Sequence, residues 1–221
     1  MSQTLSQRER YDLEWSGWKA APGAFEGVRR YGQISRRVAA LAPARMLDFG
    51  CGDGRLARAI KHLLPQTAVH GCDLSAAALD RAQGLDRHYA VDLNVEHVPE
   101  SDGSFDLVVA SEVLEHLIEP GRAVAEFHRV LRPGGHVLIT VPNVAFWRCR
   151  VEALRGGVPS VTADERHLHS FNAALLKALV VREGFEIVTM TGLRQRYESL
   201  AAVGFTWLCD TLLVIGRRST S

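Results

Sequence analysis

Apolar residues recur along this chain with two spacings that alternate. The short apolar run at 45–49 predicts a buried strand, and residues 56–64 place apolar side chains three and four positions apart, as on one face of a helix. A second apolar run at 68–72 predicts the next strand. The same pattern predicts further strands at 88–91, 104–110, 136–141, 185–190 and 211–215, and helices at 25–41, 76–83, 123–131 and 172–182.

Strands that alternate with helices pair in parallel through right-handed crossovers, so their carboxyl ends meet at one edge of the sheet and ligands gather there. Two segments fall outside the alternation. Residues 1–24 are polar with scattered aromatic residues, and we expect an arm that folds over a ligand. Residues 144–170 interrupt the rhythm and predict a small cap insertion over the strand ends, where a substrate is selected.

The first predicted strand ends in a glycine-rich turn. Gly50, Gly52 and Gly54 stand on alternate positions between that strand and the first helix, and Asp48 precedes them. Glycine lets the backbone adopt conformations closed to other residues and approach a ligand closely. This order of strand, turn and helix is typical of nucleotide-binding α/β domains. Asp73 ends the second predicted strand, where a carboxylate can accept both hydroxyls of a ribose.

Four motifs then resemble one family. The runs at 48–54, 72–75, 105–111 and 131–135 are, in this order and spacing, similar to those of class I S-adenosylmethionine (SAM)-dependent methyltransferases. The resemblance covers roughly residues 46–188 and implies an α/β fold with a Rossmann-like seven-stranded sheet, six strands parallel and the seventh (211–215) antiparallel, with helices on both faces. The resemblance also implies SAM as the cofactor and a methyl acceptor as the second substrate. The length of the chain predicts a single domain over residues 1–221.

The same resemblance assigns cofactor contacts to eleven residues. The methionine part of SAM would lie against the glycine-rich turn, the ribose against the end of the second strand, the adenine against the end of the third, and the sulfonium near the end of the fourth. In that order the residues are Asp48, Gly50, Cys51, Gly52 and Gly54, then Asp73 and Leu74, then Asp92 and Leu93, then Ser111 and Glu112. Asp92 has an alternative role as the cap of a turn.

Methyl transfer depends mostly on alignment of the acceptor with the methyl group, and an oxygen acceptor also needs a base. Glu112, Glu115 and His116 would share one face if a helix began at Ser111, and His169 could join them from the cap. His116 and His169 are therefore our candidate catalytic bases.

These side chains could instead hold a divalent cation, as in related ubiquinone-biosynthesis O-methyltransferases and small-RNA 2′-O-methyltransferases. Spacing alone leaves a fourth ligand unproven, so we favour a site without metal, in which this motif lines the cofactor cleft. A narrower likeness to the MetW family, at 102–106, 142–143, 147–150 and 155–159, leaves a regulatory SAM-binding partner as a further alternative.

Composition and net charge limit the binding partners and the cellular location that we expect. The chain has 221 residues and a net charge of +1, so no global field attracts nucleic acid. We expect no membrane span and no signal peptide, because apolar runs are short and residues 1–10 are polar. Four cysteines without paired spacing indicate reduced thiols. The prediction is a cytoplasmic enzyme, monomeric or homodimeric, that methylates oxygen or nitrogen of a small molecule.

Overall fold

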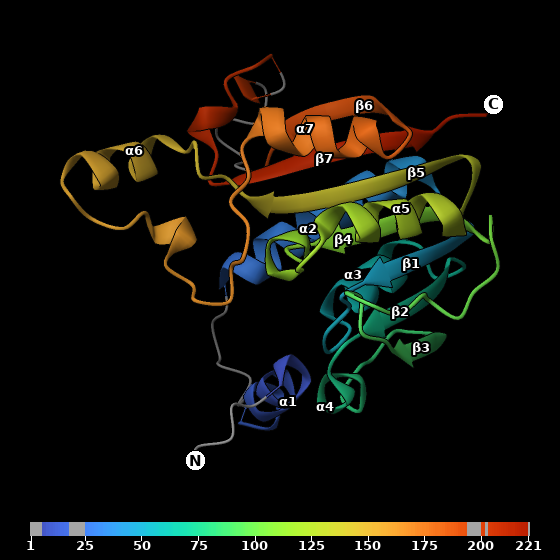
Figure 1. The fold of residues 1–221 in the computed structure, drawn as a ribbon. Coiled ribbons are helices and arrows are strands. Elements are labelled where there is room, and N and C mark those ends of the chain that lie inside the picture. The colour runs from blue at the N-terminus through green and yellow to red at the C-terminus, as the bar shows by residue number, and fades with distance from the viewer. Residues whose placement is uncertain (1–5, 18–24, 194–199, 202, 221) are drawn as a thin grey trace. The chain divides into compact units, whose positions relative to one another are not determined.

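The computed structural model describes residues 6–17, 25–193, 200–201 and 203–220, so part of the predicted arm (1–5 and 18–24) lies outside the described residues (Figure 1). The chain forms two compact units, Met1–Glu100 and Ser101–Ser221. The first contains α1 (Gln7–Gly17), α2 (Phe25–Leu41), β1 (Arg45–Phe49), α3 (Arg55–Leu63), β2 (Ala68–Asp73), α4 (Ala76–Leu79) and β3 (Arg87–Ala90). The described helices are too short or too polar to cross a bilayer.

In the first unit, three parallel strands lie in the order β3-β2-β1. Met46, Leu47 and Phe49 are buried in β1, as expected of a parallel strand that is covered on both faces. The apolar face of α3, formed by Leu56, Ala57 and Ile60, is buried as the helical spacing predicts. All three strands therefore deliver their carboxyl ends to one edge.

The second unit carries the other four strands and the cap. Its elements are β4 (Phe105–Ser111), η1 (Leu114–His116), α5 (Pro120–Val130), β5 (Leu131–Pro142), α6 (Trp147–Leu154), η2 (Ser160–Thr162), α7 (Ala173–Arg182), β6 (Phe185–Gly192), η3 (Thr206–Leu208) and β7 (Thr211–Arg218). Strand β5 pairs in parallel with β4 and antiparallel with β7, which also pairs antiparallel with β6. The seven strands and the single antiparallel strand β7 confirm the predicted fold class.

Several boundaries differ from the sequence prediction. Helix α4 ends at Leu79 because the chain turns there instead of continuing to residue 83. Strand β5 begins before the Pro133-Gly134-Gly135 turn, which forms an irregularity in its pairing with β4. Strand β7 continues to Arg218, beyond the predicted end of this strand at residue 215.

The predicted arm contains a helix that apolar spacing did not reveal. Helix α1 has eleven residues, none of them fully buried, and begins with a capping box. The Ser6 hydroxyl accepts from the Glu9 amide at 3.3 Å, and the Glu9 carboxylate accepts from the Ser6 amide at 2.7 Å. These hydrogen bonds lower the pKa of Glu9. The cap, more than apolar burial, explains why a helix begins here.

Glu100 joins the three strands of the first unit through a polar cluster. Its side chain is 8% exposed and accepts from His70 Nδ1 at 2.5 Å, Tyr89 Oη at 2.8 Å and an Arg45 Nη at 2.7 Å. Burial would raise the pKa of Glu100, but the hydrogen bonds from these three partners lower it below its usual range. The carboxylate is thus charged and fully engaged near neutral pH.

We expect Glu100→Gln to destabilise the protein by roughly 2 kcal/mol in urea unfolding, because the neutral amide weakens charge-assisted hydrogen bonds that are shielded from water. The control is Glu186→Gln, whose partner Arg217 and own side chain are more than half exposed. Such a surface pair contributes little, so that variant should unfold like the unaltered protein. Equal destabilisation by the two substitutions would contradict the role of burial.

Candidate functional site

The turn after β1 packs against neighbouring backbone, which explains its glycines. Gly50, Gly52 and Gly54 have φ angles of 76°, 50° and 75°. At Gly54 a Cβ atom would lie 2.3 Å from the carbonyl oxygen of Gln83, so no side chain fits. The Gly50 amide donates to the carbonyl of Cys72 at 2.8 Å, which fixes the turn to the end of β2.

Asp73 holds this edge together through backbone amides. One carboxylate oxygen accepts from the Gly52 amide at 2.8 Å, and the other accepts from the Ser75 amide at 2.9 Å. Burial raises the pKa of Asp73, and these hydrogen bonds partly offset the increase. Both oxygens are therefore fixed in position, with Leu74 next in the chain, where the sequence predicts the ribose contact.

Asp48 is the most deeply buried carboxyl group of the turn, at 2% exposed. Within the described ranges no hydrogen-bond partner reaches its Oδ2 atom. Burial, together with the nearby charge of Asp73, raises the pKa of Asp48 to about 7. A buried carboxyl group of this kind suits a cationic ligand group, whose charge would favour ionisation. Burial also raises the pKa of the neighbouring Cys51 thiol, which makes that residue a poor nucleophile.

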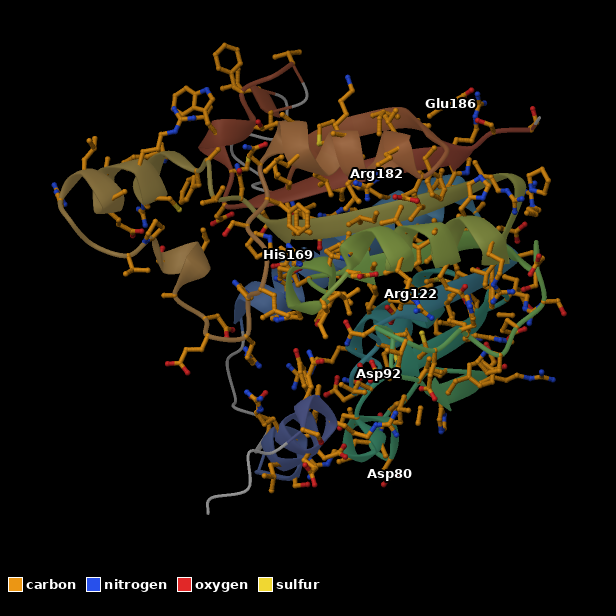
Figure 2. All side chains as sticks on the ribbon, in the orientation of Figure 1. Asp80, Asp92, Arg122, His169, Arg182 and Glu186 are labelled. Carbon is orange, nitrogen blue, oxygen red and sulfur yellow. The ribbon has the colours of Figure 1, made fainter. Side chains whose placement is uncertain are left out.

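The loop after β3 contains the residues predicted to contact adenine (Figure 2). Asp92 Oδ1 accepts from the Asn94 amide at 3.0 Å, and Leu93 is 8% exposed. The structure therefore shows Asp92 capping its own turn, the alternative role considered from the sequence. Contact of Asp92 and Leu93 with adenine stays a prediction.

In the second unit, no helix begins at Ser111, so the condition under which Glu112, Glu115 and His116 would share a helical face is not met. Glu112 has a φ of 57°, and its amide donates to the carbonyl of Thr140 at 3.0 Å. The Thr140 hydroxyl lies 3.2 Å from Ser111 Oγ and 3.1 Å from Glu112 Oε1. Thr140 was missed from the sequence, where its only signal is its place near the end of a predicted strand.

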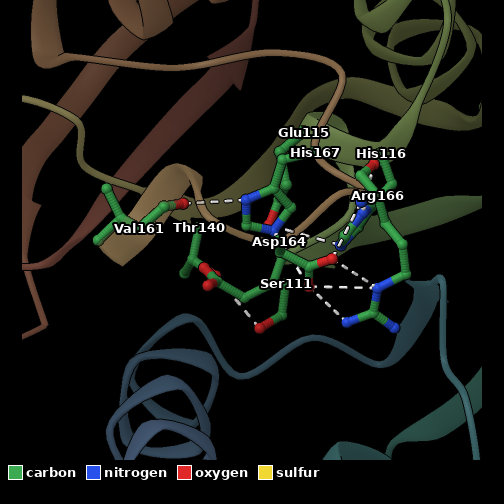
Figure 3. A network of polar contacts seen from close by, with 9 residues as sticks. Ser111, Glu115, His116, Thr140, Val161, Asp164, Arg166 and His167 are labelled. Atoms are coloured by element: carbon green, nitrogen blue, oxygen red, sulfur yellow. Dashed lines mark hydrogen bonds and ion pairs between the residues drawn. The ribbon is translucent and has the colours of Figure 1, made fainter. Parts of the chain in front are cut away.

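The following turn, η1, brings together a different group from the one expected (Figure 3). Side-chain ligand atoms of Glu115, His116 and His167 lie within 4.8 Å of one another, and Glu115 is 1% exposed. The Glu115 carbonyl accepts from the amides of Leu168 at 2.7 Å and His169 at 3.1 Å, which holds the cap segment against η1. We call these three residues the Glu115 cluster.

Both histidines of the cluster have a defined tautomer. His116 Nδ1 lies 3.2 Å from the carbonyl oxygen of Arg166, and His167 Nδ1 lies 3.0 Å from that of Val161. A carbonyl oxygen only accepts, so each Nδ1 carries the hydrogen and Nε2 of the neutral ring has a lone pair. Burial lowers the pKa of His116, which favours the neutral form. The cluster can accept a proton or bind a cation.

His169, a predicted catalytic residue, does not join this cluster. Its Nε2 atom lies 3.1 Å from the carbonyl oxygen of Ile118, so it donates there and braces the segment before α7 (Figure 2). His167, two residues before it, is the histidine of this segment that lies beside His116, with ring centroids 4.8 Å apart. Neither His169 nor Glu112 belongs to the cluster that we assign.

The chain is similar to known methyltransferases. A family model described as a methyltransferase domain matches residues 26–190. A probable SAM-dependent methyltransferase of Mycolicibacterium smegmatis is 31% identical over 81% of this chain and 68% of its own length. The ubiquinone biosynthesis O-methyltransferase of Cronobacter sakazakii is 28% identical over 63% of this chain, which spans 61% of that relative.

Among solved structures, the N-methyltransferase NodS of Bradyrhizobium japonicum, in complex with S-adenosylhomocysteine, shares the fold with a TM-score of 0.63 at 20% identity, covering 96% of this chain and 97% of its own. The family model covers most of the chain, including the glycine-rich turn, Asp73 and all three residues of the Glu115 cluster. The chain belongs to the class I SAM-dependent methyltransferase family, whose cofactor is S-adenosylmethionine.

Proposed function

We propose that this protein transfers the methyl group of SAM to an oxygen atom of a small molecule, with His116 as the general base. The observation that carries the proposal is the setting of His116: its Nδ1 lies 3.2 Å from the carbonyl oxygen of Arg166, and burial lowers the pKa of the imidazole, which favours the neutral form that a general base requires. An oxygen nucleophile must lose its proton during transfer, whereas alignment supplies most of the remaining rate.

The relatives support oxygen over nitrogen as the acceptor atom, since a ubiquinone biosynthesis O-methyltransferase is among them. A net charge of +1 counts against an RNA substrate, which would favour a basic surface. A small hydroxylated acceptor fits both observations.

For the cofactor, we assign the methionine part to the glycine-rich turn and Asp48, the ribose to Asp73, and the adenine to Asp92 and Leu93. The buried, raised-pKa carboxyl group of Asp48 supports contact with a cationic group. Ser111 and Glu112 complete the proposed cofactor contacts, on the sulfonium side.

A second mechanism has an observation of its own. The Glu115 cluster offers a buried carboxylate and two imidazole nitrogens, a donor set that suits a divalent cation, and both rings are oriented by carbonyl partners as metal-binding histidines usually are. A bound cation would lower the pKa of an acceptor hydroxyl group. In this second mechanism, deprotonation of the acceptor would depend on the bound cation and not on His116 alone.

The test uses labelled SAM with a panel of hydroxylated aromatic compounds and a metabolite extract. We expect His116→Gln to lower kcat by roughly a hundredfold, the usual contribution of a general base, without a comparable change in affinity for S-adenosylhomocysteine. Because burial lowers the pKa of His116, the neutral base persists below the usual histidine range, so kcat should fall only on the acid side of that range.

The matched control is His62→Gln, an exposed histidine at the end of α3, which should turn over normally. Unchanged kcat in His116→Gln would overturn the base assignment. Loss of turnover on treatment with a chelator, restored by Mg²⁺ or Zn²⁺, would favour the metal-assisted mechanism. Binding of S-adenosylhomocysteine without transfer to any acceptor would instead favour a regulatory SAM-binding protein.

A further inference from the structure

Helix α1 turns one face toward the rest of the first unit and exposes its other face to solvent. Gln7, Tyr11, Asp12 and Trp15 are half-buried, whereas the intervening Leu13 is 58% exposed. These four positions follow helical spacing and form one stripe. Figure 1 shows α1 beside α4, and the two helices are in contact.

The stripe contacts each segment to which the cofactor has been assigned in this unit. A Cβ atom on Gly52 would lie 3.0 Å from the indole of Trp15, so the ring covers the glycine-rich turn. Farther along, Asp12 Oδ1 accepts from the Ser75 hydroxyl at 2.6 Å, just after Asp73. Gln7 Oε1 accepts from Asn94 Nδ2 at 3.1 Å, in the loop of Asp92.

Further contacts hold the two ends of the helix. The guanidinium of Arg81 donates to the carbonyl oxygen of Trp15, and Arg8 lies 3.7 Å from a carboxylate oxygen of Glu96. Asp12 Oδ1 also lies 3.3 Å from the amide of Ala77. These contacts are polar and α1 has no fully buried residue, so the helix can detach without exposing a hydrophobic core.

We propose that α1 is a reversible cover of the cofactor site and that Trp15 and Asp12 are positioning residues for SAM. The indole of Trp15 shields the methionine part of SAM at Gly52. Asp12 fixes the helix to Ser75, close to Asp73, whose carboxylate is assigned to the ribose. The cofactor enters and leaves when α1 lifts. This inference rests on the proposed binding of SAM to the glycine-rich turn.

The decisive measurement is the dissociation rate of labelled S-adenosylhomocysteine from the full chain, chased with unlabelled compound. Trp15→Ala and Asp12→Ala should each raise that rate about tenfold or more, which corresponds to loss of about 1.4 kcal/mol of contact in the closed form. The melting temperature of the free protein should stay unchanged, because α1 has no fully buried residue. Trp15→Phe should restore part of the slow release, because a smaller ring still covers Gly52.

Leu13→Ala is the matched control, since Leu13 lies on the same helix and faces away. It should release the compound at the rate of the unaltered protein. An unchanged rate in both Trp15→Ala and Asp12→Ala, or tighter binding in Trp15→Ala, would overturn the cover while leaving SAM binding intact. Failure of the unaltered protein to bind S-adenosylhomocysteine in calorimetry would overturn the cofactor site and the cover together.

Discussion

Asp48→Asn should make the cofactor-free protein more stable than the unaltered chain at about pH 8.5, and much less so at about pH 5. The reason is the cost of ionising a carboxyl group that is 2% exposed and whose pKa is raised by burial from 3.8 to about 7. Above that pKa the folded protein must hold a buried charge, which asparagine avoids. The effect concerns the free energy of unfolding.

The sign follows from proton binding. Between 3.8 and about 7 the folded state keeps the Asp48 proton while the unfolded chain has lost it, so stability falls as pH rises through this window. Each unit by which the pKa is raised costs about 1.4 kcal/mol of unfolding free energy, so the loss of stability at high pH is at most roughly 4 kcal/mol. Urea unfolding of both proteins at the two pH values measures it.

Asp80→Asn serves as the control, because Asp80 is exposed at the end of α4 (Figure 2). Its stability should follow that of the unaltered protein at each pH. The cofactor analogue S-adenosylhomocysteine, which carries an ammonium group, should stabilise the unaltered protein more than Asp48→Asn at high pH. A stability difference between the unaltered protein and Asp48→Asn that does not change with pH would refute the buried charge.

Asp73→Ala should weaken binding of S-adenosylhomocysteine by roughly 3 kcal/mol, about a hundredfold in Kd, because two ribose hydroxyl groups each lose a charged acceptor. The substitution also removes the acceptor of the Gly52 and Ser75 amides, which loosens the turn. Calorimetric titration gives the affinity directly.

Asp53→Ala separates this effect from a general loss of charge near the turn. Asp53 pairs with Arg55 at 2.9 Å and accepts none of the amides that Asp73 holds. Its Kd should stay within about threefold of the unaltered value, as for other partly exposed ion pairs. Wild-type affinity in Asp73→Ala would remove the ribose assignment.

The glycine-rich turn and its carboxylates could be placed from the sequence because their determinants are local. Apolar runs set β1 and β2, glycines set the turn between β1 and α3, and the carboxyl ends of parallel strands share an edge. The positions of Asp48 and Asp73 follow from that geometry alone.

Helix α1 was missed for the opposite reason. It has no buried side chain and therefore no apolar period, although the spacing of Ser6 and Glu9 is that of a capping box. Its place over Gly52 depends on contacts with residues about forty to ninety positions away, such as Ser75 and Asn94, which no local pattern encodes.

The helix on which Glu112, Glu115 and His116 would share a face does not form, because one residue departs from helical geometry. Glu112 takes a positive φ and donates its amide to the carbonyl of Thr140, so the chain does not begin a helical turn there. The position of His167 beside His116 also depends on tertiary contacts. The His167 ring is held by the carbonyl of Val161, whereas the His169 ring is held by the carbonyl of Ile118.

Ser6 and Glu9 touch none of the segments assigned to the cofactor, yet their mutual hydrogen bonds govern how readily α1 unwinds. A helix of eleven residues is marginal in water once it leaves its neighbours, so detachment and melting are coupled. Changes at the cap would therefore shorten the residence time of spent cofactor without altering any ligand contact. The outermost described residues of the chain thus offer a way to tune turnover from a distance.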